Sequence, residues 1–465
     1  MATTKTTEKN KKNKSSNNRK RLGISAVAVI DNIVFSQTDS YAYYQLSNNV
    51  YDFLSSEQKV ALAMRISNAF NNLMTEKQEP IECQLIITSA PVDVDAWAEQ
   101  IKEVSKDWKT GPGFERYVEE QIMYLKNRQY MKKMTFLGVN LGKRGALNMA
   151  GLNVFESGFK GAMETLKTWM DTIIQTPTEA VSAQEENDAR KKEEELFRIL
   201  SIGHLKAQRV TSEEILLLIK RQFYPAMPAP YLDVDHENRI GPGDIDLEVG
   251  SAIENKYRWL KITQMFDDVE VSGYRATLSF AKFPKDIYYP AGIPFLYFPS
   301  RLGAPFTCYS RFTLHPNQKM KLELEKKKKE QKDELENISA AQNSLDSAVD
   351  SFPADVAQAL DDIHRLSEML AADKTPWVEG SYRIVVEAPT EETLREYCSK
   401  LKQSYDDLGI LLQWTAGDQA QLFLEQMPGD THRVQAFSQI TNLDVLSTSG
   451  MNFSSDVGDL VFGTD

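Results

Sequence analysis

Apolar residues recur along this chain with two periods, which together predict a mixed α+β fold. Steps of three and four residues are typical of helices, and short β-branched or alternating runs are typical of strands. Residues 382–386 therefore predict a strand, and Thr390 is the N-cap of a helix whose apolar face begins at Leu394. Gly409 ends that helix, and residues 410–414 form a second strand. This β-α-β unit is half of a ferredoxin-like fold, an antiparallel sheet with helices on one face.

The same patterns predict a first α+β unit over residues 22–144. Ser55 and Gln58 form a capping box, so a helix that buries one apolar face begins there. A glycine–proline–glycine break at 111–113 precedes a long helix. The predicted strands span 32–35, 40–46, 83–88 and 134–141, and the further helices span 94–104 and 114–125.

In residues 145–230 the pattern changes from strand-like to helical. It predicts a helical insertion that packs beside the sheet rather than inside it. Helices are expected at 158–172 and 185–200, the second of them rich in charged residues. A capping box formed by Thr211 and Glu214 starts a third helix.

The remaining residues divide into four parts. Residues 231–315 are the β-rich part of a second α+β unit, 316–373 a charged helical hairpin, 374–429 the β-α-β part that completes the second unit, and 430–465 a linker. The expected strands of the β-rich part span 258–263, 274–281, 295–299 and 306–314. The fold class is thus α+β, with ferredoxin-like antiparallel sheet units, a helical insertion and a helical hairpin.

Two stretches of the second unit leave alternatives open. The aromatic run at 288–299 either fills the core at the edge of the sheet or forms an interaction surface, and its strand-like length favours the core. The lysines at 326–329 point all round a helix, and flanking glutamates give them partners. The hairpin is therefore either a solvated, salt-bridged pair, which we prefer, or a protruding arm that contacts another subunit.

Charge is concentrated at the N-terminus. Residues 1–21 hold eight Lys or Arg and one Glu, a net charge of +7. Because the whole chain has a net charge of −12, the remaining residues carry −19. We expect this basic tail to be disordered, because it lacks the apolar residues that would offset ordering. It is either a solvated tail or a contact to anionic lipid or DNA through Arg19, Lys20 and Arg21. The acidic remainder argues against broad nucleic-acid binding.

Three stretches together resemble a known family. They are a V-E-A-x-T-x-E-x-L strand-to-helix turn at 386–394, an L-G-I-x-L stretch at 408–412, and an F-L-x-x-M-P-G segment at 423–429, all after a charged helical hairpin. They resemble the N-terminal part of the VirB4-type ATPases (TraC/TraE-like) that energise conjugation and type IV secretion, in the form found in conjugative elements of Gram-positive bacteria. The similarity extends to residues 43–73 and to a P-x-D-V-D-A-W turn at 91–97.

The resemblance raises the question of a nucleotide site, and the sequence does not supply one. The pattern G-x-x-x-x-G-K-[ST] is absent. At residues 138–144 the two glycines are four apart, and Arg144 stands where a Mg²⁺-binding hydroxyl is needed. We therefore expect no cofactor in this chain, and ATP and Mg²⁺ in a full-length parent whose RecA-like motor domain would follow the linker. Whether the chain is an enzyme is left open, since no catalytic site is found.

Other chemistry is weakly indicated. The five histidines are isolated, with no second ligand at metal-binding spacing. Acidic residues at 233–246 either bind a hard cation or form a solvated loop, and the Gly-Pro-Gly turn within them favours the loop. Cys83, Cys308 and Cys398 are far apart, a pattern of a reducing compartment. We predict no metal site and no catalytic residue.

The resemblance implies docking and assembly. In that family this region attaches the motor to inner-membrane components of the conjugation channel for DNA or protein transfer, and subunits associate as hexamers. With no secretory signal and no apolar run of about 18 residues, we expect a cytoplasmic protein, peripheral at the cytoplasmic face of the cell membrane, with contact to anionic lipid as one option. The alternative is a complete non-enzymatic scaffold or structural interaction protein.

Overall fold

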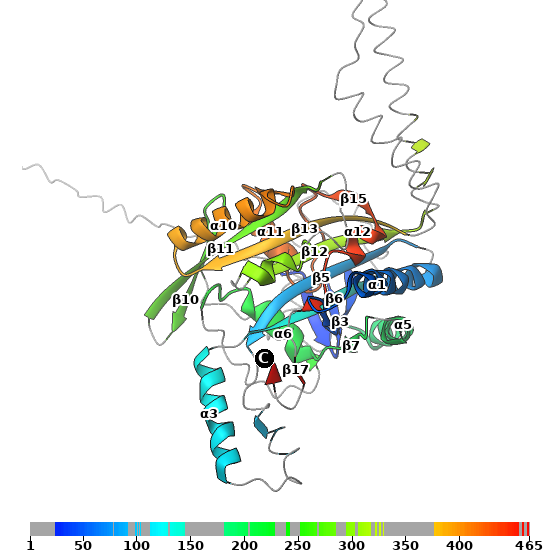
Figure 1. Cartoon of the computed structure of the whole chain (residues 1–465). Coiled ribbons are helices and arrows are strands. Elements are labelled where there is room, and N and C mark those ends of the chain that lie inside the picture. The colour runs from blue at the N-terminus through cyan, green and yellow to red at the C-terminus, as the bar shows by residue number, and fades with distance from the viewer. Residues whose placement is uncertain are drawn as a thin grey trace, which may run out of the picture.

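One large antiparallel sheet runs through the part of the chain that the computed structural model describes (Figure 1). The mixed α+β class is confirmed. The described residues are 24–77, 79–91, 98–99, 101, 103, 112–128, 131–144, 181–202, 205–227, 239–241, 252–266, 269–284, 294–302, 306–317, 321–322, 325–326, 329, 376–454, 458–459 and 463–464.

The first unit has the strand order β7-β3-β6-β5. Helix α1 (Ser56–Lys77) connects β3 (Asp39–Leu46) to β5 (Ile81–Pro91), and β6 (Met131–Lys143) lies between these strands, antiparallel to both. Helix α5 (Ala183–Ile202) and the short β7 (Gln208–Arg209) follow, and β7 pairs with β3. Two split β-α-β units interlock in this way, which is the ferredoxin-like arrangement. The predicted insertion is thus not wholly beside the sheet, because β7 is part of it.

The second unit repeats this order as β14-β11-β13-β12. Its strands are β11 (Val269–Lys282), β12 (Thr307–His315), β13 (Trp377–Ala388) and β14 (Leu411–Trp414). Helix α10 (Glu391–Asp406) connects β13 to β14, and β11 lies between them. Each unit also adds a hairpin strand beside its fourth strand, namely β2 (Ile33–Ser36) on β3 and β10 (Leu260–Phe266) on β11.

The two units join edge to edge. Strand β5 of the first unit pairs antiparallel with β12 of the second, so that Cys83 faces Phe312 and Gln84 faces Arg311. The same strand of each unit is therefore used for the junction, and one sheet extends across both units. Along each strand, successive side chains point to opposite faces of the sheet. Each face of this sheet is therefore continuous across the junction.

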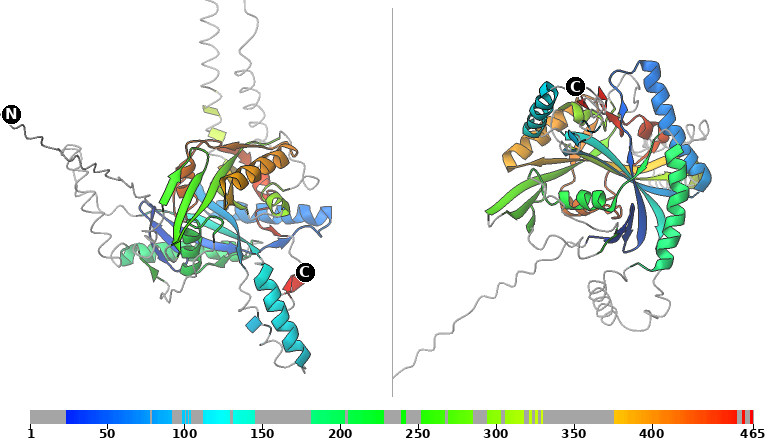
Figure 2. Two further views of the ribbon diagram at one scale, coloured as in Figure 1. Left: turned by 90° about the vertical axis from the view of Figure 1, so that its left-hand side faces the viewer. Right: turned by 90° about the horizontal axis from the view of Figure 1, so that it is seen from below.

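One face of the sheet is apolar and carries most of the helices. Cys83, Leu85 and Phe312 point to this face and pack under α1, α5, α10 and α12 (Leu443–Ser447) in one core. The opposite face carries α6 (Ser212–Arg221) and α11 (Gln419–Glu425). Helix α3 (Pro112–Arg128) instead projects away from the sheet, as Figure 1 and the left view of Figure 2 show.

Three of the predicted helix starts are confirmed. The backbone N–H of Gln58 donates to Ser55 Oγ at 3.3 Å, and the Ser55 N–H donates to the Gln58 side chain at 2.9 Å. Thr211 and Glu214 make the same reciprocal pair before α6. Thr390 accepts from the backbone N–H of Thr393 as the N-cap of α10. These caps satisfy N–H groups that a helix cannot pair internally.

One predicted strand is wrong. Residues 295–299 form a turn followed by the short 3-10 helix η4 (Phe298–Leu302), because Pro294 and Pro299 cannot donate to a sheet ladder. Phe295, Leu296 and Tyr297 are buried in the core, so the core alternative for this aromatic run is confirmed over these residues. Strand β1 (Ala26–Ile30), which pairs with β2, was not predicted from the sequence.

Residues 430–454 belong to the folded body. Strand β15 (Gln439–Asn442) pairs with β13, and β16 (Phe453–Ser454) pairs parallel with β4 (Asn49–Val50). The region predicted as a linker is therefore packed as far as Ser454. The basic tail 1–21, the predicted helix 158–172 and nearly all of the hairpin 318–372 lie outside the described residues.

Candidate functional site

The sites named from sequence fall in different places. Arg19, Lys20 and Arg21 lie outside the described residues, as do the acidic residues at 233–246. Residues 138–143 are the end of β6, paired with β3 and β5, and Gly142 takes a φ of +111°. This stretch is therefore a strand and not a phosphate-cradling loop.

The described residues contain neither a metal-ligand cluster nor a membrane-spanning helix. No three His, Cys, Asp or Glu side chains there gather at metal-binding distance. No helix in the described part is long and apolar enough to cross a membrane. The three cysteines are buried free thiols, and burial raises the pKa of Cys308 and of Cys398 to about 12, so these thiols stay protonated near neutral pH.

The most unusual polar feature is a set of three buried arginines on the face opposite α1 and α10. Arg275, Arg383 and Arg311 stand on the neighbouring strands β11, β13 and β12, and each is at most 1% exposed. We call them the arginine row. A buried guanidinium is stable only if its N–H groups find acceptors. Most of these acceptors come from residues 425–436, which we call the covering segment.

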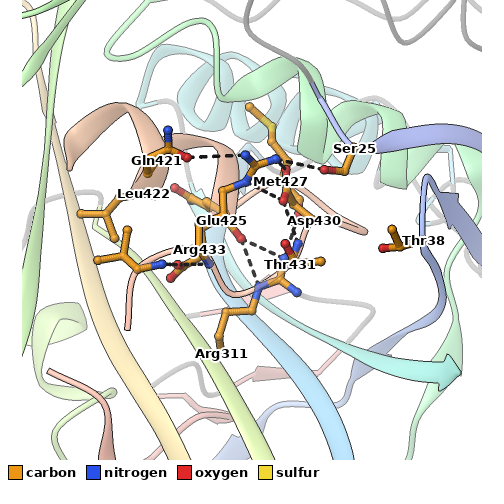
Figure 3. Close-up of polar contacts among 12 residues, drawn as sticks. Ser25, Thr38, Arg311, Gln421, Leu422, Glu425, Met427, Asp430, Thr431 and Arg433 are labelled. Carbon is orange, nitrogen blue, oxygen red and sulfur yellow. Dashed lines mark hydrogen bonds and ion pairs between the residues drawn. The ribbon is translucent and has the colours of Figure 1, made fainter. Parts of the chain in front are cut away.

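The covering segment follows α11 and crosses the sheet without regular structure, since residues 426–438 form no helix or strand. Arg311 donates from Nε and Nη2 to the carbonyl of Glu425 at 3.1 and 2.8 Å, and from Nη2 to the carbonyl of Met427 at 3.2 Å. From the first unit, Gln84 donates to the carbonyl of Gln426 at 2.9 Å. Gln84 also donates to the carbonyls of Glu425 and Met427, so side chains of both units bind the same few backbone carbonyls. Figure 3 shows Arg311 beside Glu425 and Met427.

Arg383 holds the far end of the covering segment. Its Nη2 donates to the carbonyls of Val434 and Ala436 at 2.9 and 2.8 Å. His432 lies beside it, with Nε2 3.0 Å from the hydroxyl of Ser381. Burial and the charges of Arg383 and Arg311 lower the pKa of His432 to about 4, so its imidazole is neutral near pH 7.

Arg275 connects the covering segment to the end of α6 through hydrogen bonds. It donates to the carbonyl of Gln222, just after α6, at 3.1 Å, and to the side chain of Gln426. Glu387, directly opposite on β13, lies 3.5 Å from its guanidinium. Burial lowers the pKa of Arg275, and the Glu387 charge opposes this shift.

Two glycines allow the covering segment to lie close to the first unit. The hydroxyl of Tyr43 donates to Gln84 and accepts from the backbone N–H of Gly429 at 2.7 Å. The Tyr43 ring lies over Gly138, where an added Cβ would approach the ring to 2.5 Å. Gly429 has a φ of +78°, and a Cβ there would meet the side chain of Val34 at 2.5 Å. Only glycine meets both requirements at Gly429.

Two carboxylates of the covering segment, Glu425 and Asp430, accept hydrogen bonds from other residues of the same segment. Glu425 is fully buried, and its Oε2 accepts from the backbone N–H groups of Arg433 and Val434 at 2.9 and 2.8 Å. The carboxylate of Asp430 accepts hydrogen bonds from Nε and Nη2 of Arg433, at 2.7 and 2.8 Å. Arg433 Nη2 also donates to Ser25 Oγ at 3.0 Å, which links the segment to the residues just before β1 (Figure 3).

Burial and neighbouring charges act differently on the pKa of Arg311 and on the pKa of Glu425. Burial alone would lower the pKa of Arg311, but neighbouring tyrosines and carboxylates raise it overall, so the guanidinium stays charged. Burial raises the pKa of Glu425, while Arg383 and Arg311 oppose this shift. The arginine row can therefore bind backbone carbonyls firmly. It acts as a structural site that fixes the covering segment across the two units.

The arginine row was missed from sequence, although a signal exists. Each arginine follows a tyrosine inside a strand-like apolar run, as in Tyr274–Arg275, Tyr382–Arg383 and Tyr309–Ser310–Arg311. An arginine at an inward position of a central strand must be paired. Of the covering segment, only residues 425–429 were singled out from the sequence, as part of the F-L-x-x-M-P-G stretch, and the rest was assigned to a linker.

Comparison with known proteins assigns no family to the chain. No model of a known protein family matches it, and no curated protein sequence matches it. The resemblance to VirB4-type ATPases therefore stays a prediction.

Proposed function

We propose that this chain is the N-terminal docking and assembly region of a VirB4-like conjugation or type IV secretion ATPase. In this role it attaches the motor to inner-membrane components of the channel and helps subunits associate, up to a hexamer in the assembled protein. ATP and Mg²⁺ would be bound by the motor of the longer parent. The chain would act at the cytoplasmic face of the membrane, where its basic tail can contact anionic lipid.

The observation that carries this proposal is where the three resembling stretches lie. The turn at 386–394 connects β13 to α10, the stretch at 408–412 connects α10 to β14, and the segment at 423–429 runs from α11 onto the arginine row. They follow one another between residues 386 and 429 and belong to one unit and its cover. A pattern that falls on consecutive parts of one structural unit supports common descent more strongly than scattered matches do.

The arrangement also suits a docking region mechanically. The covering segment is held by donors from both units, and Arg433 extends the contacts to Ser25. A force applied at the start of the folded body would reach residues 425–436 through hydrogen bonds and not through a flexible connection. This supports a rigid part that passes load between a membrane partner and a motor.

Membrane flotation tests the proposal. The full chain is mixed with bacterial membranes that carry or lack the cognate conjugation apparatus, and the fraction that floats is measured. Matched variants lack residues 2–21 or carry Arg19→Gln, Lys20→Gln and Arg21→Gln together. Flotation that requires the apparatus and survives the tail variants is the expected result.

Two other outcomes would overturn docking to the channel. Flotation that disappears with the tail but does not need the apparatus would mean lipid electrostatics alone. A chain that never floats would favour the alternative of a non-enzymatic scaffold. A separate titration with Mg-ATP should detect no binding to this chain, and saturable binding would contradict the assignment of ATP to the motor.

A further inference from the structure

The turn between β9 (Ala252–Asn255) and β10 holds an aromatic residue in a backbone conformation that favours glycine. Tyr257 has a φ of +69°. The N–H of Arg258 donates to the carbonyl of Lys256 at 2.9 Å, so Tyr257 is the central residue of a three-residue turn. Such a turn with a positive φ is rare, and a bulky side chain makes it costly. The fold therefore holds Tyr257 in this conformation against its local preference.

Two hydrogen bonds fix the backbone of Tyr257. Its N–H donates to Asn255 Oδ1 at 3.1 Å. Its carbonyl accepts from the backbone N–H of Gly417 at 2.7 Å, and Gly417 lies in the connection between β14 and α11. Both backbone polar groups of Tyr257 are thus paired within the chain. The turn is held by its own hairpin and by a segment that is distant in sequence, so it is rigid.

The side chain that this turn carries is largely exposed. Tyr257 has 64% of its surface exposed, and the flanking Lys256 and Arg258 are exposed as well. A ring that stays out of the core gains little packing energy to offset the strain of its backbone. Residues held in sparsely populated backbone conformations cluster at functional sites. The strain at Tyr257 therefore indicates that its ring acts outside the core.

The surface beside the turn consists of residue types that dominate binding energy at protein interfaces. Trp259 and Trp414 are half-buried, and their ring centroids lie 6.4 Å apart. The guanidinium of Arg395 lies 4.8 Å from the ring centroid of Trp259, and its side chain is 59% exposed. Tyr, Trp and Arg are the types enriched among the residues that contribute most to protein association. A rigid turn also lowers the cost of ordering on binding.

The charges of the turn indicate the chemistry of its partner. Residues 254–261 hold three cations and one carboxylate, in a chain whose net charge is −12. Lys256 and Lys261 share the carboxylate of Glu254, at 2.7 and 3.7 Å. Arg258 takes part in no ion pair within the part of the chain that the structure describes. A complementary partner carries carboxylates beside an apolar pocket that fits a phenol ring.

We propose that Tyr257 and Arg258 dock into an apolar pocket, bordered by carboxylates, on a protein component of the membrane apparatus. The phenol ring fills the pocket, and the guanidinium of Arg258 pairs with the carboxylates. A lipid surface fits less well, because a single ring offers little apolar area for insertion and Glu254 repels anionic lipid. The proposal rests on the docking function proposed above and names the surface and the class of partner.

Tyr257→Gly separates the role of the backbone from that of the side chain. Glycine adopts a positive φ without steric cost, so the variant should unfold at a higher urea concentration than the natural protein. The same variant should dock at least about tenfold more weakly, because the ring is gone. A purely structural residue would not gain stability and lose binding together. A Tyr257→Gly protein that is less stable than the natural one would overturn the strained turn and the proposal with it.

Flotation of the full chain with bacterial membranes that carry the cognate apparatus measures docking. The natural sequence is compared with Tyr257→Gly, Tyr257→Phe and Arg258→Gln over a range of protein concentrations. Tyr257→Phe keeps the ring and should bind as the natural chain does. Arg258→Gln should bind more weakly, and the difference should shrink at high salt. Tyr117→Ala removes another exposed tyrosine, on α3, and is the matched control that should change nothing.

The outcomes separate this proposal from the proposed function. Apparatus-dependent flotation that is equal for the natural chain and Tyr257→Gly would overturn the role of Tyr257 and leave the docking function standing. Flotation that never depends on the apparatus would overturn both. Binding to vesicles of phosphatidylcholine and phosphatidylserine that Tyr257→Gly abolishes would mean that the turn contacts lipid, which overturns the protein partner.

Discussion

Gln84 and Arg311 face each other across the junction of the two units, and both donate to the same backbone carbonyls. Arg311 reaches the carbonyls of Glu425 and Met427, and Gln84 reaches those of Glu425, Gln426 and Met427. The junction and the covering segment are therefore stabilised by one shared set of hydrogen bonds.

The shared acceptors predict that Gln84 and Arg311 are energetically coupled. Arg311→Met should lower the free energy of unfolding by about 3 kcal/mol, and Gln84→Met by about 1 kcal/mol. Either single variant leaves the carbonyls of Glu425 and Met427 with one remaining donor. The double variant leaves buried carbonyls without any donor, so it should cost about 1 kcal/mol more than the two single effects added.

Urea unfolding of the four proteins measures this coupling. Arg116→Met is the control, because Arg116 pairs with Glu120 on the surface of α3 and its side chain is 81% exposed. It should change the free energy of unfolding by at most about 0.5 kcal/mol. Strictly additive effects of Gln84 and Arg311 would show that the shared carbonyls do not link them.

The close approach of Tyr43 to Gly138 predicts that a single methyl group is harmful there. Gly138→Ala places a Cβ against the Tyr43 ring, which is itself fixed by Gln84 and Gly429. We expect a loss of about 1–3 kcal/mol from overpacking, measured by thermal or urea unfolding.

Gly113→Ala is the matched control for that change. It lies in α3, and an added Cβ there meets nothing within 4 Å. Alanine is favoured over glycine in a helix, so this variant should be neutral or more stable by up to about 1 kcal/mol. Equal losses from the two substitutions would contradict the packing of Tyr43 over Gly138.

The capping box before α6 predicts a defined loss when its hydroxyl is removed. Thr211→Ala leaves the backbone N–H of Glu214 without its acceptor, which lies at 3.2 Å. The expected loss is about 1 kcal/mol in urea unfolding. Gln435→Ala, at an exposed position, should stay within about 0.5 kcal/mol. A Thr211→Ala protein as stable as this control would argue against the cap.

His432 predicts a loss of stability in acid. The pKa of His432 is lowered to about 4 in the folded protein, against an ordinary value of 6.5, with burial, Arg383 and Arg311 as the causes. The unfolded chain therefore binds the proton first, and stability falls as the pH drops from about 6.5 to about 4. Ser381 and Glu82 also act on His432 but do not reverse this sign.

His432→Asn isolates this contribution. The variant has no imidazole to protonate, so its stability relative to the natural protein should be constant above about pH 7 and should rise steadily between about pH 6.5 and 4. Urea unfolding at a series of pH values measures the difference. A difference that does not vary with pH would mean that His432 titrates normally in the fold.

Local signals allowed several elements to be predicted. Thr390, Leu394 and Gly409 mark the start, the buried face and the end of α10, because caps and three- and four-residue steps depend on neighbours in sequence. The strand prediction at 295–299 failed, because an aromatic run of strand length can equally fill a core without joining a ladder.

The sequence by itself determined the main strands of both units, the starts of α1, α6 and α10, and that the chain is α+β. Only the tertiary structure decided that β5 and β12 join two units into one sheet, and that Arg275, Arg311 and Arg383 meet residues 425–436. These contacts link residues up to about 340 positions apart, as with Gln84 and Glu425. Their partners are set by strand order and register, which no local pattern encodes.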